Sequence, residues 1–234
     1  MTKIYCDTSN IKEIIHCIKK FNISGVTTNP SIMRNEGVKK YKDHCINILK
    51  VINNRPLSVE VFADTDYEIV EQANKISKWA KNIYVKVPVI NTKGKFLKNV
   101  ITNLNKNKIK LNITAVFTLK QLRDIKNAIN KQTPVIVSIF SGRIADSGTD
   151  PEPLIKKAKK LFKNHKNVKI LWASVRENYN IIESSKSKCH IITVPSSILS
   201  KLNQFNKNLN KFSIETVKGF YNDAKKSKFK IKTN

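Results

Sequence analysis

The 234-residue sequence is poor in the residues that mark disordered or extracellular chains. It contains only 6 glycines, 7 prolines and 4 cysteines, whereas 40% of its residues are hydrophobic. This composition excludes a collagen-like or linker-rich chain and predicts a folded protein with a sizeable core. Cys6, Cys17, Cys45 and Cys189 form no CxxC pair. Neither a disulfide framework nor a metal site is therefore indicated, and we expect reduced thiols that serve as packing groups.

The sequence also lacks a long apolar run. No stretch approaches the roughly 18 residues that a membrane-spanning helix needs. The N-terminus, MTKIYCDTSN, has no apolar signal-peptide core. We therefore expect no membrane partner and a cytoplasmic location.

Acidic residues are scarce. The chain has 17 Asp and Glu against 44 Lys and Arg, which gives a formal net charge of +27. Such a charge could serve nucleic acid, an anionic membrane or small anionic substrates. Because the lysines are spread along the chain and not gathered with aromatic residues on one element, we expect small anionic substrates and no nucleic-acid partner. We expect most of the excess lysines to form a solvated surface.

Short apolar runs alternate with helical patterns along the whole chain. They predict eight strands, at residues 3–7, 24–29, 57–63, 83–89, 109–117, 135–140, 168–174 and 190–196. Alternating strands and helices imply parallel strands, and eight such units predict an α/β fold of the closed (β/α)₈ or TIM barrel type. An open doubly wound sheet is the alternative, but no GxGxxG or P-loop motif follows any run. We expect one domain over residues 1–234, with an additional C-terminal helix at about 211–226.

Several polar residues interrupt these apolar runs. In a closed barrel alternate strand residues point inward, and the C-terminal strand ends form the active-site face. The period of two directs a set of polar side chains to this face: Glu60, Lys86, Asn112, Thr114, Ser138 and Ser174, with Asp7 and Asn29 at the ends of the first two runs. On the seventh run, Trp172 is expected to face inward together with Ser174.

Some of these residues have a simpler explanation. Asp7 could cap the following helix, and Asn29 before Pro30 could open a turn. Lys86 and Glu60 are harder to explain in this way, because burying an unpaired charge costs several kcal/mol. A purely structural ion pair between these two side chains is the alternative.

A lysine inside a barrel favours a covalent mechanism. Desolvation penalises the ammonium of Lys86 and favours the neutral amine, which attacks carbonyl carbons. The resulting Schiff base acts as an electron sink and permits cleavage or formation of the adjacent carbon–carbon bond. Glu60, Thr114 and Asp7 are of the right types to move protons. The residues therefore predict a lysine-dependent, aldolase-type enzyme.

Seven segments match the pattern of a known family. They are YCDTSN, GVTTNPSI, SVEVFAD, YVKVP, NITAVF, FSGRIAD and WASVR. Over roughly residues 3–226 the chain resembles the transaldolases and the related fructose-6-phosphate aldolases. The resemblance implies a (β/α)₈ barrel without metal or other cofactor and, because small relatives commonly assemble through the C-terminal helix, a homo-oligomer.

The resemblance also implies a reaction. A dihydroxyacetone unit would pass between ketose and aldose phosphates, so that sedoheptulose 7-phosphate and glyceraldehyde 3-phosphate give erythrose 4-phosphate and fructose 6-phosphate. This is a transferase reaction of the pentose phosphate pathway in carbohydrate metabolism. The sugar phosphates would be the partners of the protein.

The resemblance assigns roles residue by residue. Lys86 would form the Schiff base, and Asp7 would exchange a proton with the hydroxyl at the carbon whose bond breaks. Glu60 and Thr114 would hold a catalytic water. The other residues would bind the substrate. Asn29 and Asn112 would hold its hydroxyls, and Ser138 would hold its dihydroxyacetone part. Its phosphate would be bound by Arg143, Ser174 and Arg176.

Two positions bear on the choice between transferase and aldolase. Aldolase relatives typically have Gln at the position of Glu60 and Tyr at that of Phe140. Glu60 and Phe140 therefore resemble the transferase, in which the enamine waits for an aldehyde acceptor. The segment SGTDPEPLIKKAKK beside the phosphate side departs from the usual pattern. Fructose-6-phosphate aldolase, an enzyme of another sugar pathway and a non-catalytic sugar-phosphate binder are the alternatives.

Overall fold

The fold is a closed barrel of eight parallel strands. The computed structural model describes residues 1–231. The chain forms two compact units, of which the first is residues 1–199. In this unit the strands pair in sequence order, and β1 closes the barrel against β8. The strands are β1 (Lys3–Asp7), β2 (Gly25–Thr27), β3 (Leu57–Glu60), β4 (Ile83–Pro88), β5 (Leu111–Val116), β6 (Val135–Ile139), β7 (Val168–Trp172) and β8 (Ile191–Pro195). The prediction of a TIM barrel is confirmed, and the alternative of an open doubly wound sheet is wrong.

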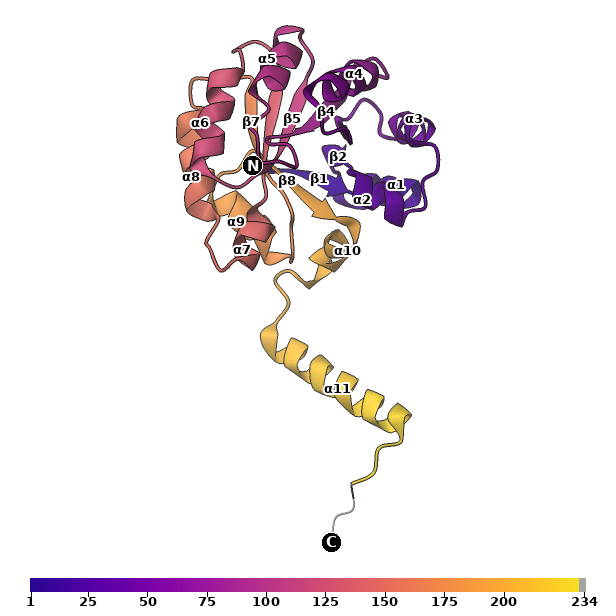
Figure 1. Cartoon of the computed structure of the whole chain (residues 1–234). Helices are drawn as coiled ribbons and strands as arrows, with labels where there is room; N and C mark the ends of the chain where they lie inside the picture. Colours follow the sequence, from indigo (N-terminus) through magenta and orange to yellow (C-terminus); the bar gives the residue numbers. More distant parts are fainter. Residues whose placement is uncertain (232–234) are drawn as a thin grey trace. The chain divides into compact units, whose positions relative to one another are not determined.

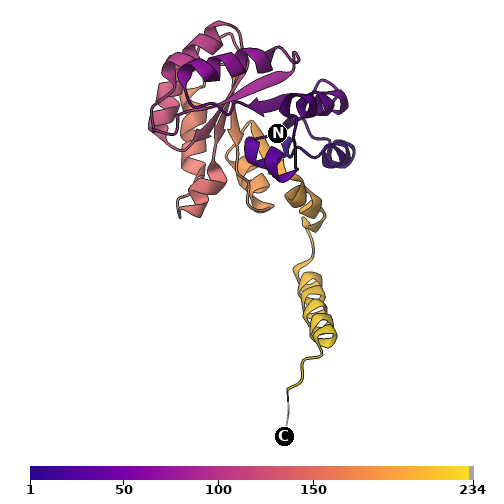
Figure 2. The same cartoon turned by 45° about the vertical axis from the view of Figure 1, so that its right-hand side comes forward.

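Helices lie around the outside of the strands (Figures 1 and 2). Those of the first unit are α1 (Ile11–Phe21), α2 (Pro30–Asn35), α3 (Tyr41–Val51), α4 (Asp66–Ser77), α5 (Lys98–Lys106), α6 (Leu119–Ala128), α7 (Ser141–Asp146), α8 (Glu152–Leu161), α9 (Tyr179–Lys186) and α10 (Ser196–Leu199). Two short helices, α2 and α7, follow β2 and β6 almost directly. They therefore border the C-terminal strand ends, where the candidate residues gather.

The inside of the barrel is filled by apolar side chains. Tyr5, Ile136, Leu171 and Ile191 are buried there together with Ala173. One backbone position makes room for them: a Cβ atom on Gly25 would lie 2.6 Å from the Tyr5 ring. Glycine is therefore required at this point of β2, because any other residue would displace that ring.

The inward orientation predicted for Trp172 on the seventh run is wrong. Leu171 and Ala173 belong to the apolar cluster inside the barrel, so alternation turns Trp172 away from it. Trp172 is nevertheless buried. Ser174 lies beyond the end of β7, where its φ of 63° breaks the alternation.

The second unit contains a short 3-10 helix, η1 (Ser200–Gln204), and the helix α11 (Leu209–Ser227). Asn208 caps α11 by accepting a hydrogen bond from the backbone N–H of Lys211. The helix spans the range expected at about 211–226. One domain over residues 1–234 stays a prediction, as does assembly through this helix.

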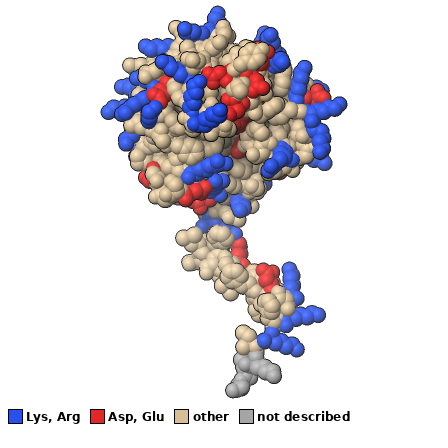
Figure 3. All heavy atoms as spheres, viewed as in Figure 1, with Lys and Arg blue, Asp and Glu red and all other residues tan. Residues whose placement is uncertain are grey.

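Positive charge is dispersed over the face of the protein that Figure 3 shows. In this view Lys and Arg side chains lie around the face, with fewer Asp and Glu among them.

The four cysteines are free and buried. Within residues 1–231, no helix has the length and apolarity needed to cross a membrane.

Candidate active site

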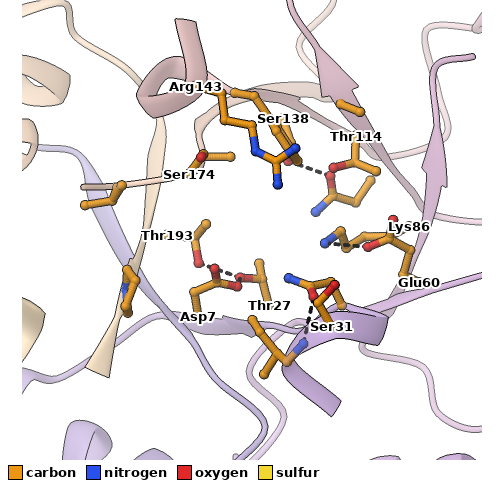
Figure 4. Close-up of a pocket in the computed structure, with 18 of the residues that line it drawn as sticks. Asp7, Thr27, Ser31, Glu60, Lys86, Thr114, Ser138, Arg143, Ser174 and Thr193 are labelled. Atoms are coloured by element: carbon orange, nitrogen blue, oxygen red, sulfur yellow. Dashed lines mark hydrogen bonds and ion pairs between the residues drawn. The ribbon is translucent and has the colours of Figure 1, made fainter. Parts of the chain in front are cut away.

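A hollow of about 600 Å³ lies at the C-terminal ends of the strands. Its lining includes every candidate residue: Asp7, Asn29, Glu60, Lys86, Asn112, Thr114, Ser138, Phe140, Arg143, Ser174 and Arg176. Figure 4 shows many of these side chains pointing toward one another from different strands. The residues named from the strand pattern and from the family resemblance are thus brought together by the fold, while their roles stay predictions.

The neighbours of Lys86 are set by strand register. Lys86 on β4 is the Cα partner of Glu60 on β3 and of Asn112 on β5. Its ammonium lies 2.9 Å from Glu60 Oε2 and donates to the backbone oxygen of Thr28 at 2.8 Å. Lys86 is buried, so these two acceptors compensate for the water it has lost.

Asp7 at the end of β1 lies on a chain of hydroxyl groups. Thr27 Oγ1 donates to Asp7 Oδ1 at 2.6 Å, and the hydroxyls of Thr27 and Thr193 are 2.5 Å apart. Because Thr27 gives its only proton to Asp7, Thr193 must donate to Thr27. Burial raises the pKa of Asp7 above its ordinary value, although Lys86 and the bond from Thr27 act in the opposite direction.

Asn10 and Asn29, and not Asp7, cap the helices that follow β1 and β2. The N-cap of α1 is Asn10, whose side chain accepts from the backbone N–H groups of residues 12 and 13, so the interpretation of Asp7 as a cap is wrong. Asn29 does cap a helix, because its Oδ1 accepts from the backbone N–H of Ile32 at 2.9 Å. This bond uses only the amide oxygen of Asn29, so its NH₂ group is left to donate to a ligand.

A buried polar chain crosses the floor of the hollow. Ser138 Oγ donates to Asn112 Oδ1 at 2.6 Å, and Asn112 Nδ2 donates to Ser58 Oγ at 3.0 Å. Thr114 is also buried, but its hydroxyl has no hydrogen-bond partner among the described residues. Buried hydroxyls normally have one. Thr114 is therefore suited to hold a water or a substrate oxygen.

The two arginines lie at the edge of the hollow, after β6 and β7. Arg176 donates to the carboxylate of Asp146 from Nε at 3.0 Å and from Nη2 at 2.5 Å. Arg143 lies 5.5 Å from the centre of the Phe140 ring. A Cβ atom on Gly142 would lie only 1.5 Å from the backbone oxygen of Ser174, so glycine alone lets α7 approach the loop after β7.

Sequence reasoning missed several residues that contact the candidate set, among them Thr27, Thr193 and Asp146. Thr27 and Thr193 orient Asp7, and Asp146 holds Arg176. Thr27 and Thr193 could have been found from the alternation of inward and outward residues, because both lie within predicted strands. The contact of Asp146 depends on how α7 packs, which no local pattern signals. Among residues 1–231, no group of three or more His, Cys, Asp or Glu could hold a metal ion.

The model of the Transaldolase/Fructose-6-phosphate aldolase family matches residues 4–233. A probable transaldolase from Dehalococcoides mccartyi is 31% identical over 205 residues, which cover 86% of this chain and 90% of the relative. A probable transaldolase from Caldicellulosiruptor saccharolyticus is 34% identical over 202 residues, covering 86% and 88%.

Two solved structures have the same fold at low sequence identity. The 3-hexulose-6-phosphate synthase from Salmonella typhimurium matches with a TM-score of 0.58 and 12% identity, over 85% of this chain and 91% of that one. KGPDC from Streptococcus mutans matches with a TM-score of 0.53 and 10% identity, over 83% and 88%. At these identities the likeness concerns the barrel alone.

Proposed function

Because the chain belongs to the transaldolase and fructose-6-phosphate aldolase family and is an enzyme of that type, we propose that it is a transaldolase. It would convert sedoheptulose 7-phosphate and glyceraldehyde 3-phosphate into erythrose 4-phosphate and fructose 6-phosphate. The observation that carries the proposal is the contact between Lys86 and Glu60 in the hollow that also holds Asp7. A place in the pentose phosphate pathway, a cytoplasmic location and a homo-oligomeric state belong to the same proposal.

The first half of the reaction forms a Schiff base on Lys86. Glu60 lies 2.9 Å from the ammonium and would accept its proton, which frees the amine to attack the ketose carbonyl. The carbinolamine then loses water and becomes an iminium ion. Glu60 would return a proton to the departing hydroxyl, and the unpaired hydroxyl of Thr114 would hold the water.

The second half breaks and remakes a carbon–carbon bond. Asp7 would take the proton from the hydroxyl beside the breaking bond, whose electrons move into the iminium ion to form an enamine. An aldose phosphate leaves, another enters, and the enamine attacks its aldehyde while Asp7 returns the proton. Thr27 and Thr193 would keep the Asp7 carboxylate aimed at this hydroxyl.

The remaining candidate residues would hold the substrate. The free NH₂ group of Asn29 and the chain of Asn112 and Ser138 would bind sugar hydroxyls and the dihydroxyacetone part. Arg143, Arg176 and Ser174 would bind the phosphate at the edge of the hollow. Guanidinium groups suit this role because they stay charged and offer several donors in a fixed geometry.

Product analysis tests the proposal. The enzyme is incubated with fructose 6-phosphate, with and without erythrose 4-phosphate as acceptor. A transaldolase is expected to form sedoheptulose 7-phosphate and glyceraldehyde 3-phosphate only when the acceptor is present. Release of free dihydroxyacetone at the same rate with and without the acceptor would instead identify a fructose-6-phosphate aldolase. A protein that turns over neither mixture acts on another sugar or only binds.

We expect Arg143→Ala to weaken the use of phosphorylated substrates selectively. A hydrogen bond to a charged group contributes about 1.5–3 kcal/mol, so kcat/KM for fructose 6-phosphate should fall by about 10-fold to 100-fold. Steady-state kinetics with unphosphorylated fructose provide the control, because that substrate lacks the group that Arg143 binds. An equal loss with both sugars would contradict a phosphate-binding role.

We expect Phe140→Tyr to increase the release of free dihydroxyacetone. The Phe140 ring lines the hollow, and a phenol there would supply a hydroxyl that positions water to protonate and hydrolyse the enamine. A positioned proton donor typically contributes 10²-fold or more, so release should rise by at least about tenfold. Phe117→Tyr is the matched control, since its ring lies 5.6 Å from that of Phe140 but does not line the hollow. If release does not rise in Phe140→Tyr, the proposed reason for the phenylalanine is wrong.

A further inference from the structure

Two further hollows lie at the N-terminal ends of the strands, at the opposite end of the barrel from Lys86. One has a volume of about 680 Å³ and lies at the starts of β1, β4, β7 and β8. The other, of about 250 Å³, lies between the end of α8 and β7. They adjoin, because both are lined by Lys159, Lys169 and His190. We call the two together the basal hollow.

The charged side chains other than histidine that line the basal hollow are all lysines. They are Lys3, Lys159, Lys163, Lys166, Lys169 and Lys188. In the described part of the chain none of them forms an ion pair with Asp or Glu. The active-site hollow differs, because its lysine and arginines are accompanied by two carboxylates. The basal hollow therefore concentrates positive charge that the protein itself does not neutralise, which attracts anions.

Two histidines add hydrogen-bonding groups to this positive surface. Burial, with the charges of Lys159 and Lys169, lowers the pKa of His190 to about 4, so its ring is neutral at pH 7. Its Nδ1 accepts from the backbone N–H of Ile170 at 2.9 Å, which places the proton on Nε2 and makes that atom a donor. His165 is 7% exposed, and its Nδ1 has no hydrogen-bond partner among residues 1–231.

The shape of the site favours a small ligand over a nucleic acid. The aromatic rings that line it are Tyr5, Tyr84 and Phe162. Tyr5 and Phe162 are buried and Tyr84 is partly buried, so the hollow offers no row of exposed rings on which bases could stack. The lysines instead surround two adjoining compartments, each of which can receive an anionic group.

We propose that the basal hollow binds a small anion that carries two or more phosphate groups. Lysine ammonium groups from both compartments contact the phosphates, and the Nε2 proton of His190 adds a neutral donor between them. Orthophosphate fills only one compartment and binds more weakly. The proposal does not depend on the activity of the enzyme, because the residues involved lie away from the catalytic hollow.

The four histidines of the chain provide site-specific probes. We would follow their ring Cε1–H signals by NMR, assigned with single His→Gln variants, while inorganic pyrophosphate is added at low salt. The signals of His165 and His190 should shift and saturate, whereas those of His16 and His44, which line neither compartment, should not. The affinity should fall as salt is added, because the charges at the site are exposed to solvent.

Charge-matched variants locate the binding. Lys159→Met/Lys169→Met should weaken pyrophosphate binding at the two histidines by at least about tenfold. Lys19→Met/Lys75→Met removes the same charge from exposed lysines outside the hollow and should change it by less than about twofold. Because Lys159 Nζ also bonds to the backbone oxygen of Lys188, Lys169→Met alone serves if the double variant does not fold.

Three results would overturn the proposal. The first is that pyrophosphate leaves the signals of His165 and His190 unchanged, even if it binds elsewhere. The second is that both double variants lose affinity equally, which would indicate a general effect of net charge. The third is that orthophosphate binds as tightly as pyrophosphate, because the site would then not require two phosphate groups.

Discussion

Lys86→Met is expected to abolish turnover, with kcat/KM reduced by at least about 10³-fold. Methionine has a similar length but no amine, so no Schiff base can form. The measurement is intact mass after borohydride reduction with fructose 6-phosphate present, followed by peptide mapping. The parent protein should carry a stable three-carbon adduct on Lys86, and the variant should carry none.

Lys110→Met is the matched control for this experiment. Lys110 Nζ also donates to a backbone oxygen, that of Lys81 at 2.7 Å, but it does not line the catalytic hollow. This variant should keep the adduct and the turnover. An adduct that persists in Lys86→Met would exclude Lys86 as the nucleophile. If the parent protein forms no adduct with fructose 6-phosphate or with sedoheptulose 7-phosphate, the proposed substrates are wrong.

Stability measurements separate a catalytic Lys86 from a purely structural ion pair. Lys86→Met leaves the carboxylate of Glu60 without its charged partner, and breaking such a buried pair costs about 3–5 kcal/mol. Lys86→Met/Glu60→Gln removes both charges and should recover much of this loss in denaturant unfolding. Turnover should not return with stability. Activity in the double variant would instead support the structural alternative.

Asp7→Asn is expected to lower the rate by about 10²-fold to 10⁴-fold, because the amide cannot accept the substrate proton. The parent enzyme should also lose kcat/KM as the pH falls through the raised pKa of Asp7, since the base is then protonated. This acid limb should therefore begin above the ordinary aspartate range, and it should be missing from the residual activity of the variant. An unchanged pH profile in Asp7→Asn would contradict the role of Asp7 as the base.

The same substitution is expected to raise the melting temperature at pH 7. The folded state binds the proton of Asp7 more tightly than the unfolded chain does, so ionised Asp7 destabilises the fold at neutral pH. The gain from Asp7→Asn should shrink as the pH falls through the raised pKa. Asp64→Asn is a control of opposite sign, because hydrogen bonds from Thr92 lower the pKa of exposed Asp64. Calorimetry over pH 3–7 measures both.

The sequence predicted the barrel because its strands are separated by regular helical segments. It also placed Lys86 and Glu60 on the inside, since each interrupts an apolar run. An ion pair between them could be raised only as an alternative, because register between parallel strands depends on the packing of the whole barrel. Local patterns also could not predict that the side chain of Asn29 both caps α2 and lines the hollow.

Two features of the barrel could not be predicted, one because the backbone leaves regular strand geometry and one because it depends on barrel closure. Alternation misplaced Trp172, because β7 ends before Ser174, whose positive φ brings its side chain to the hollow out of phase with the strand. The hydroxyl chain to Asp7 joins Thr27 to Thr193, which are 166 residues apart and meet only when the barrel closes. Alternation could place each threonine inside the barrel, but the contact between them has no local signal in one sequence.

The filled interior of the barrel also determines how reactants move. Tyr5, Ile136, Leu171 and Ile191 occupy the space below the catalytic residues, so no channel runs through the barrel. Whatever reaches Lys86 must enter and leave through the same opening. In the proposed reaction, the first aldose phosphate would depart before the acceptor takes its place, while the three-carbon unit would stay attached to Lys86. With a covalent intermediate on Lys86, a barrel with a single opening would favour a ping-pong order of substrates, so the apolar core would influence the kinetics as well as the stability of the protein.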